Sequence, residues 1–249
     1  MIKVSHFVWN WKKKVHSLVF NVSNALFGPE LTHRSRLARF LLLSWTTVQA
    51  YLSPAQWRQR AFERRYPDAP WLVPSSIEYL DQLLRPSFNA FEWGSGRSTI
   101  WIAKRSRTLI SVEGRRGWYQ EMLNRIEGEG LTEKIQIRLA EVTTEFAFKP
   151  DEIERYAGVI DTVPDSSLDF VLVDGHFRTA CLRRCFRKIR PGGILAIDNF
   201  DTREFDCCRE LSAAPGARVF TNGISETVVF QVGVHQKAQW EASLAEFSV

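Results

Sequence analysis

Residues 91–101, FEWGSGRSTIW, place an acid and two glycines between an apolar run and the expected start of a helix. A glycine-rich turn between a strand and a helix lets the backbone approach a ligand closely. Two classes of nucleotide-like cofactor are bound at such turns. The turn alone is therefore a weak signal, and the residues around it have to decide between the two classes.

Those neighbours favour a methyl donor over a dinucleotide. A dinucleotide site has the pattern G-x-G-x-x-G/A, but the residue three positions after Gly96 is Thr99. Glu92 would also be an unfavourable neighbour for a pyrophosphate, whereas the sulfonium and ammonium groups of S-adenosylmethionine would attract its carboxylate. The predicted cofactor-binding residues of this turn are Glu92, Gly94, Ser95, Gly96, Ser98 and Thr99.

A second acid, Glu113 in LISVEG, follows Glu92 by 21 residues and ends the next expected strand. A carboxylate at this position can accept hydrogen bonds from both hydroxyls of a ribose. We therefore add Glu113 and Gly114 to the predicted cofactor-binding residues. The alternative is a surface acid that only ends a strand.

From residue 88 onward, short apolar segments alternate with expected helices. Connections long enough for crossovers separate the first five strands, which predicts a mostly parallel sheet covered on both faces. Only NGISE separates the last two strands, so they should form an antiparallel hairpin at the edge. The expected fold is α/β, with a Rossmann-like seven-stranded sheet. Its predicted strands are 89–92, 108–112, 135–139, 168–173, 194–197, 219–221 and 227–232. Residues 141–167 are expected to be a long loop, a length typical of a lid or a substrate wall.

The N-terminal part differs from the rest in charge. The 249-residue chain has a net charge of +5, but residues 1–70 carry 11 Lys and Arg against 3 Asp and Glu. We expect a basic helical extension over 1–69 and the main domain over 70–249. Trp9, Trp11 and Lys12 to Lys14 suit the headgroup layer of a membrane or an anionic partner. The simpler interpretation is a helix packed on the main domain with a solvated basic face.

Other patterns bear on location and partners. The four cysteines resemble neither a disulfide framework nor a zinc ribbon, which predicts reduced and mostly buried thiols. The longest uncharged stretch, residues 40–57, contains polar residues and a proline and makes a poor membrane span. We expect a cytoplasmic protein, with peripheral contact at the inner membrane face left open.

The basic run RRCFRKIR, residues 183–190, fits a solvated helix face. A nucleic-acid partner is therefore disfavoured, although the basic N-terminus leaves an RNA acceptor open.

Candidate reacting groups follow the fourth and fifth strands. Asp174, Asp198 and Asn199 form an oxygen-only set that suits Mg²⁺. In the alternative, no metal binds and the first carboxylate faces the donor's amino group or the acceptor. His176 is the candidate general base, or else a loop histidine that bonds to the backbone. Arg178 could hold an anionic acceptor, or else form a salt bridge at the start of the next helix.

Four segments in order, EWGSGRST, SVEG with RRGWY, LDFVLVDGHFR and RPGGILAIDNFD, resemble the motifs of class I S-adenosylmethionine-dependent methyltransferases. The resemblance covers residues 70–235 and implies that fold, that cofactor and a transferase activity. VDGHFR with GGILAIDN is also similar, more distantly, to catechol-type O-methyltransferases. This implies a metal at Asp174, Asp198 and Asn199 that would lower the pKa of an acceptor hydroxyl. His176 departs from that pattern, in which a lysine soon after the aspartate acts as the base.

The expected function is transfer of a methyl group to an oxygen of a small molecule or saccharide. The alternatives are a nicotinamide-dependent oxidoreductase, against which Thr99 counts, and a non-catalytic binding or membrane-associated scaffold.

Overall fold

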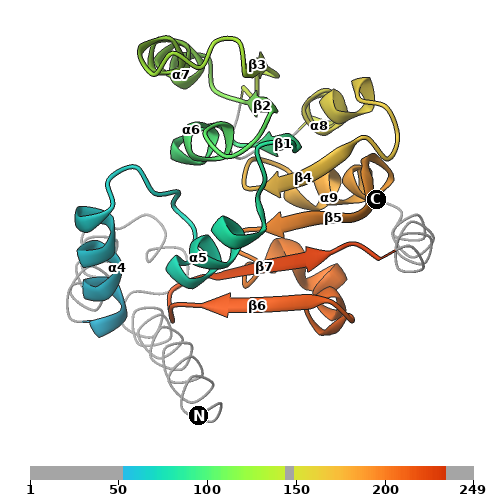
Figure 1. Ribbon diagram of the computed structural model, residues 1–249. Coiled ribbons are helices and arrows are strands. Elements are labelled where there is room, and N and C mark those ends of the chain that lie inside the picture. The colour runs from blue at the N-terminus through green and yellow to red at the C-terminus, as the bar shows by residue number, and fades with distance from the viewer. Residues whose placement is uncertain (1–52, 144–148, 234–249) are drawn as a thin grey trace, which may run out of the picture. The chain divides into compact units, whose positions relative to one another are not determined.

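The computed structural model describes residues 53–143 and 149–233 (Figure 1). Its contacts divide the chain into two units, 1–65 and 66–249. In the first unit the described element is α4 (Pro54–Arg65), a polar helix with no buried residue. Trp9, Trp11 and the lysines that follow them lie outside the described residues.

The second unit is built on one seven-stranded sheet, which confirms the predicted α/β, Rossmann-like fold. The strand order is β3-β2-β1-β4-β5-β7-β6. The first five strands pair in parallel, and β7 is antiparallel to both β5 and β6, as expected of a C-terminal edge hairpin. The strands are β1 (Asn89–Trp93), β2 (Thr108–Glu113), β3 (Ile135–Leu139), β4 (Leu168–Val173), β5 (Ile189–Ile197), β6 (Ala217–Thr221) and β7 (Glu226–Gln231).

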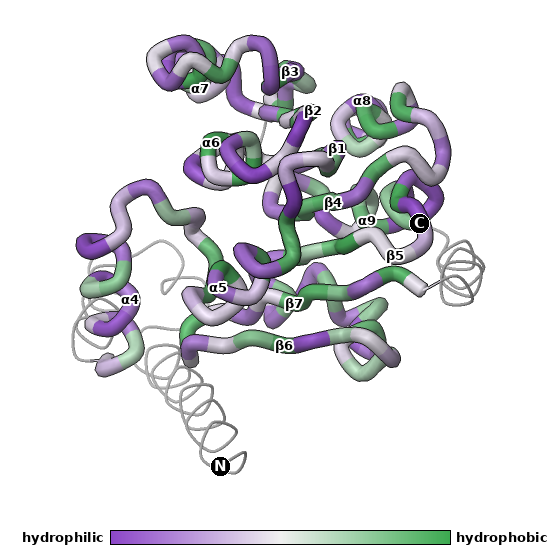
Figure 2. Tube along the Cα trace, viewed as in Figure 1, coloured by the Kyte–Doolittle hydropathy of each residue, from purple (hydrophilic) through white to green (hydrophobic). Residues whose placement is uncertain are grey.

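Strands at the middle of the sheet are apolar on both sides because helices cover both faces. Figure 2 shows hydrophobic residues along β4, β5 and β7. β5 begins five residues earlier than expected. Ile189 already pairs with Leu168, and the pairing shifts register before Ile194 continues it opposite Phe170. The intervening Pro-Gly-Gly segment hid this early start in the sequence.

Two groups of helical elements cover the sheet. Phe91 and Trp93 point into the core formed with α8 (Pro150–Ala157), η1 (Gly158–Thr162), α9 (Arg178–Lys188) and η2 (Arg203–Ala213). Because side chains alternate along a strand, Ala90 and Glu92 point to the other face. There α6 (Arg97–Ala103) packs on β1 and β2, α7 (Arg116–Gly128) on β2 and β3, and α5 (Pro74–Leu83) on β6 and β7.

The prediction of a long loop over residues 141–167 was wrong for most of the described part of this segment. The segment contains α8 and η1, and Tyr156, Ala157 and Ile160 are fully buried in the core. These residues pack against Cys181, Leu182, Cys185 and Phe186 of α9, whose apolar stripe needs this cover. The polar start of α8, PDEIER, hid the buried residues that follow. The segment therefore builds the core instead of forming a lid.

The expected state of the cysteines is confirmed. Cys181, Cys185 and Cys208 are buried, Cys207 is exposed, and all four are free thiols. Within residues 53–143 and 149–233, no helix is both long and apolar enough to span a bilayer.

Candidate functional site

The predicted site residues gather at the carboxyl ends of β1, β2, β4 and β5. The turn after β1 lies against the turn after β4: a Cβ added to Gly94 would lie 2.5 Å from the carbonyl oxygen of Asp174. Gly94 also has a φ of 93°, which favours glycine. This position therefore needs glycine so that the two turns can meet.

Gly96 differs from Gly94. Its φ of 176° is ordinary extended backbone, and a Cβ there would meet no atom of the described residues within 4 Å. Its N–H donates to Thr99 Oγ1 over 2.8 Å, which fixes the start of α6. The space beside Gly96 is available to a ligand.

Glu92 is fully buried beneath this turn, on the side of α6. Its Oε1 accepts a hydrogen bond from Ser111 Oγ over 2.8 Å, and its Oε2 has no partner within the described part of the chain. Burial raises the pKa of Glu92 to about 7, although the hydroxyls of Thr99, Ser111 and Ser98 act to lower it. Ser98 and Thr99 are themselves buried.

Glu113 joins the end of β2 to the glycine turn. One carboxylate oxygen accepts from Ser95 Oγ over 2.6 Å, and the other accepts from the backbone N–H of Arg115 over 2.7 Å. Trp118 Nε1 of α7 donates to the Ser95 carbonyl over 2.8 Å. A carboxylate has about four acceptor positions, so Glu113 keeps capacity for a ligand's hydroxyls.

His176 leans toward the end of β2. A Cβ added to Gly114 would lie 2.7 Å from His176 Cδ2, so the imidazole packs on the Gly114 backbone. The backbone N–H of His176 donates to the hydroxyl of Tyr156, a contact that sequence reasoning missed. Burial holds the pKa of that tyrosine well above its usual value, so its hydroxyl stays neutral. The imidazole thus lies on the side of the predicted ribose acid, Glu113.

Arg178 points the other way, toward β5. The left-handed backbone of Phe177 (φ 51°) separates it from His176. Its Nη1 donates to the Asp198 carbonyl and to Asn199 Oδ1, over 2.9 and 2.7 Å. Its Nη2 donates to Asp174 Oδ1 over 3.2 Å, and its Nε to the Gly175 carbonyl over 3.0 Å. These contacts are the ones expected if Arg178 forms a salt bridge at the start of α9.

Asp198 is held from the last strand. Thr227 Oγ1 of β7 donates to Asp198 Oδ1 over 2.6 Å, and the backbone N–H of Val73 donates to that threonine over 3.2 Å. Burial raises the pKa of Asp198 to about 6, while Thr227 and the charge of Arg178 lower it. Burial and then the charge of Asp198 raise the pKa of Asp174. No sequence motif marks Thr227, because it lies near the start of an ordinary strand after a turn.

The set Asp174, Asp198 and Asn199 does not fit the predicted magnesium ion. The Arg178 guanidinium already binds the Asp174 carboxylate and the Asn199 side-chain oxygen, and it also binds the main-chain carbonyl of Asp198. Elsewhere in residues 53–143 and 149–233, no group of three or more His, Cys, Asp or Glu side chains could hold a metal ion. The metal prediction therefore has no support here.

Arg97, the residue after the glycine turn, was also missed as a candidate. Its guanidinium carbon lies 5.0 Å from the centroid of the Trp71 ring. Its Nη1 is buried and has no hydrogen-bond partner within the described part of the chain. A buried guanidinium nitrogen without a partner is costly and indicates a missing acceptor, such as a carboxylate. Its position next to Gly96 could have drawn attention to it.

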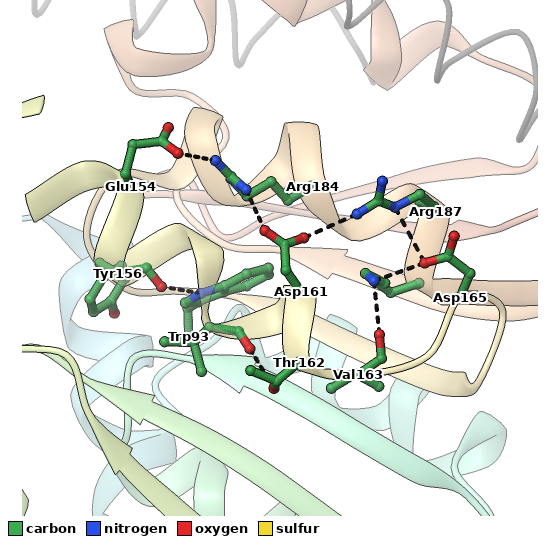
Figure 3. Close-up of polar contacts among 11 residues, drawn as sticks. Trp93, Glu154, Tyr156, Asp161, Thr162, Val163, Asp165, Arg184 and Arg187 are labelled. Carbon is green, nitrogen blue, oxygen red and sulfur yellow. Dashed lines mark hydrogen bonds and ion pairs between the residues drawn. The ribbon is translucent and has the colours of Figure 1, made fainter. Parts of the chain in front are cut away.

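The basic run on α9 is largely neutralised by acids. Figure 3 shows Arg184 between Glu154 and Asp161, and Arg187 between Asp161 and Asp165. These acids come from α8, η1 and the loop after η1. The run therefore belongs to an ion-pair network that ties three segments together, and it offers less free positive charge than the sequence suggests.

Comparison with known proteins supports the fold. Neither a protein-family model nor a curated protein matches the chain. Among solved structures, an rRNA methylase from Streptococcus thermophilus is 15% identical, with 66% of this chain and 99% of that chain covered and a TM-score of 0.51. A methyltransferase-like protein from Silicibacter pomeroyi is 20% identical (71% and 96% covered, TM-score 0.49). An O-methyltransferase from Bacillus cereus, solved in complex with SAH, is 18% identical (75% and 96% covered, TM-score 0.45).

The strand order and the first of these similarities agree: the chain has the class I S-adenosylmethionine-dependent methyltransferase fold.

Proposed function

We propose that this protein is an S-adenosylmethionine-dependent methyltransferase whose acceptor is an oxygen of a small molecule or saccharide. The observation that carries the proposal is the joining of the glycine turn, Glu113 and the β4 turn at one edge of the sheet. The residues present fit the donor. Among the described residues, Gly96 has open space beside it, Glu113 keeps acceptor capacity, and Arg97 Nη1 lacks an acceptor.

The donor supplies an electrophilic methyl group when bound. Glu113 would bind the ribose hydroxyls, and Arg97 would bind the carboxylate of the donor's amino-acid end. Asp174 would attract the ammonium group. Methyl transfer is a displacement at carbon, so the chain's main contribution would be alignment of the two reactants.

His176 is the proposed general base for the acceptor hydroxyl. Its support is its place two residues after Asp174 and the ability of an imidazole nitrogen to accept a proton. His176→Ala should lower turnover by roughly 100-fold or more. An unchanged rate would leave it as a loop residue that packs on Gly114.

The first experiment is isothermal titration of the protein with S-adenosylmethionine and S-adenosylhomocysteine. Micromolar binding of both supports the proposal, and Gly96→Arg should abolish it by filling the open space. Binding of NAD(H) in their place would favour the oxidoreductase alternative. Donor binding without turnover on any acceptor would favour the scaffold.

The acceptor screen should compare phenols and hydroxyl-bearing acids, saccharides, and structured RNA. RNA is included because one structure of similar fold is described as an rRNA methylase. Transfer to RNA in preference to the small acceptors would overturn the acceptor class and leave the methyl donor unchanged.

A further inference from the structure

Arg178 lies where three oxygens converge. They are the Asp174 carboxylate, the Asp198 carbonyl and the Asn199 side-chain amide, at 3.2, 2.9 and 2.7 Å from its terminal nitrogens. The Arg178 side chain is only 16% exposed, so bulk water does little to screen it. Four hydrogen bonds fix the guanidinium, the fourth being from Nε to the Gly175 carbonyl.

We propose that Arg178 is a built-in cation that takes the place of the divalent metal implied by the resemblance to catechol-type enzymes. The chain keeps the oxygen-bearing residues Asp174, Asp198 and Asn199 and supplies their positive partner from α9. A guanidinium is permanently charged and presents donors in a fixed fork, so it can satisfy several oxygens at once. These oxygens therefore have a positive partner without a bound metal ion.

Guanidinium and metal exclude each other at this place. Mg²⁺ needs oxygens at about 2.0–2.1 Å in near-octahedral geometry. The Asn199 and Asp174 oxygens that would supply them already accept from Arg178, and the two like charges would repel. In addition, Asp198 Oδ1 accepts from Thr227, which orients this carboxylate toward β7.

The role of Arg178 as a cation can be tested without the methyl donor or an acceptor. Mn²⁺ binding, followed by electron paramagnetic resonance, should show no site on the wild-type protein that depends on Asp174. Arg178→Ala should expose the oxygens and bind Mn²⁺ at least about 10-fold more tightly than the wild type does. Arg183→Ala, on the same helix, is the control and should behave as the wild type.

Two outcomes would overturn the inference. One is Mn²⁺ binding by the wild type that Asp174→Asn removes, because the metal site would then coexist with Arg178. The other is a folded Arg178→Ala protein that gains no affinity for Mn²⁺. Should Arg178→Ala not fold, Arg178→Gln keeps a hydrogen-bonding side chain without charge and is judged by the same criterion. Titration with S-adenosylhomocysteine tests the proposed function separately.

Discussion

At the scale of single residues, the two glycines of the turn have different roles. Gly94 is required by its backbone conformation and by its contact with the Asp174 carbonyl. Gly96 has an ordinary backbone conformation and open space beside it. One glycine therefore serves the fold, and the other is proposed to serve the donor.

Alanine at each glycine should separate these roles. Gly94→Ala should lower the free energy of unfolding by at least about 1–2 kcal/mol from the left-handed backbone alone, with the clash at Asp174 adding to it. Gly96→Ala should leave the melting temperature within about 2 °C, yet weaken S-adenosylhomocysteine binding. Gly117→Ala in α7, where a Cβ also meets open space, is the control. Equal melting temperatures for the Gly94 variant and the wild type would contradict the assignment.

Arg97 allows a sharper test of the donor's orientation. Arg97→Gln should weaken binding of S-adenosylhomocysteine about 10-fold or more and leave binding of 5′-methylthioadenosine unchanged, because the latter lacks the amino-acid end. Arg105→Gln is the matched control, because Arg105 also stacks on a tryptophan: its guanidinium carbon lies 4.2 Å from the centroid of the Trp101 ring. Equal losses for both ligands would show that Arg97 supports the turn and does not bind the carboxylate.

At the scale of elements, α9 is held by charges on one side and by apolar packing on the other. Lys188 illustrates this: it is 3% exposed, and its ammonium donates to the Val163 carbonyl and to Asp165, both over 2.8 Å. The other pairs of the network are more exposed. Exposed pairs add little to stability, so the buried lysine should matter most.

Lys188→Met should lower the free energy of unfolding by roughly 1–3 kcal/mol, because the Val163 carbonyl loses its buried donor. Arg183→Met on the same helix should change it by less than about 0.5 kcal/mol. Denaturant unfolding at two salt concentrations measures both. A loss that disappeared at high salt would mean that Lys188 acts as a surface charge, against this account.

The same elements show where sequence reasoning succeeded and failed. The runs ending in Glu92, Glu113 and Asp174 are apolar and are followed by turns, so these strands could be predicted. Helix α8 could not be predicted, because its buried residues follow a polar start and are buried only by packing against α9. The hydrogen bond from Thr227 to Asp198 and those from Arg178 to Asp198 and Asn199 join segments that are distant in the sequence, and no local pattern encodes such contacts.

At the scale of the whole molecule, one buried acid should shape the dependence of stability on pH. The pKa of Glu92 rises from 4.5 to about 7 on folding. The folded state then holds more protons than the unfolded state between these values, so stability falls as pH rises from 4.5 to about 7. Below 4.5 and above 7 this group adds no further slope.

Glu92→Gln should remove that fall. Relative to the wild type, the variant should gain stability progressively between pH 5 and pH 7.5, by up to about 3 kcal/mol. Urea unfolding across this range measures the difference, with Glu121→Gln on the exposed side of α7 as the control. A difference that did not vary with pH would show that the carboxylate titrates as if it were in water.

The position of β7 in the sheet means that the sheet can be completed only after the last strand has been synthesised. β7 comes last of the seven strands in sequence, yet it lies between β5 and β6 and carries the threonine that holds Asp198. While the ribosome is still translating residues before Glu226, β6 has no strand to join and β5 has an open edge. A chain released early would therefore lack the hydroxyl that holds the Asp198 carboxylate and the strand that pairs with β5, although every residue of the glycine turn would be present.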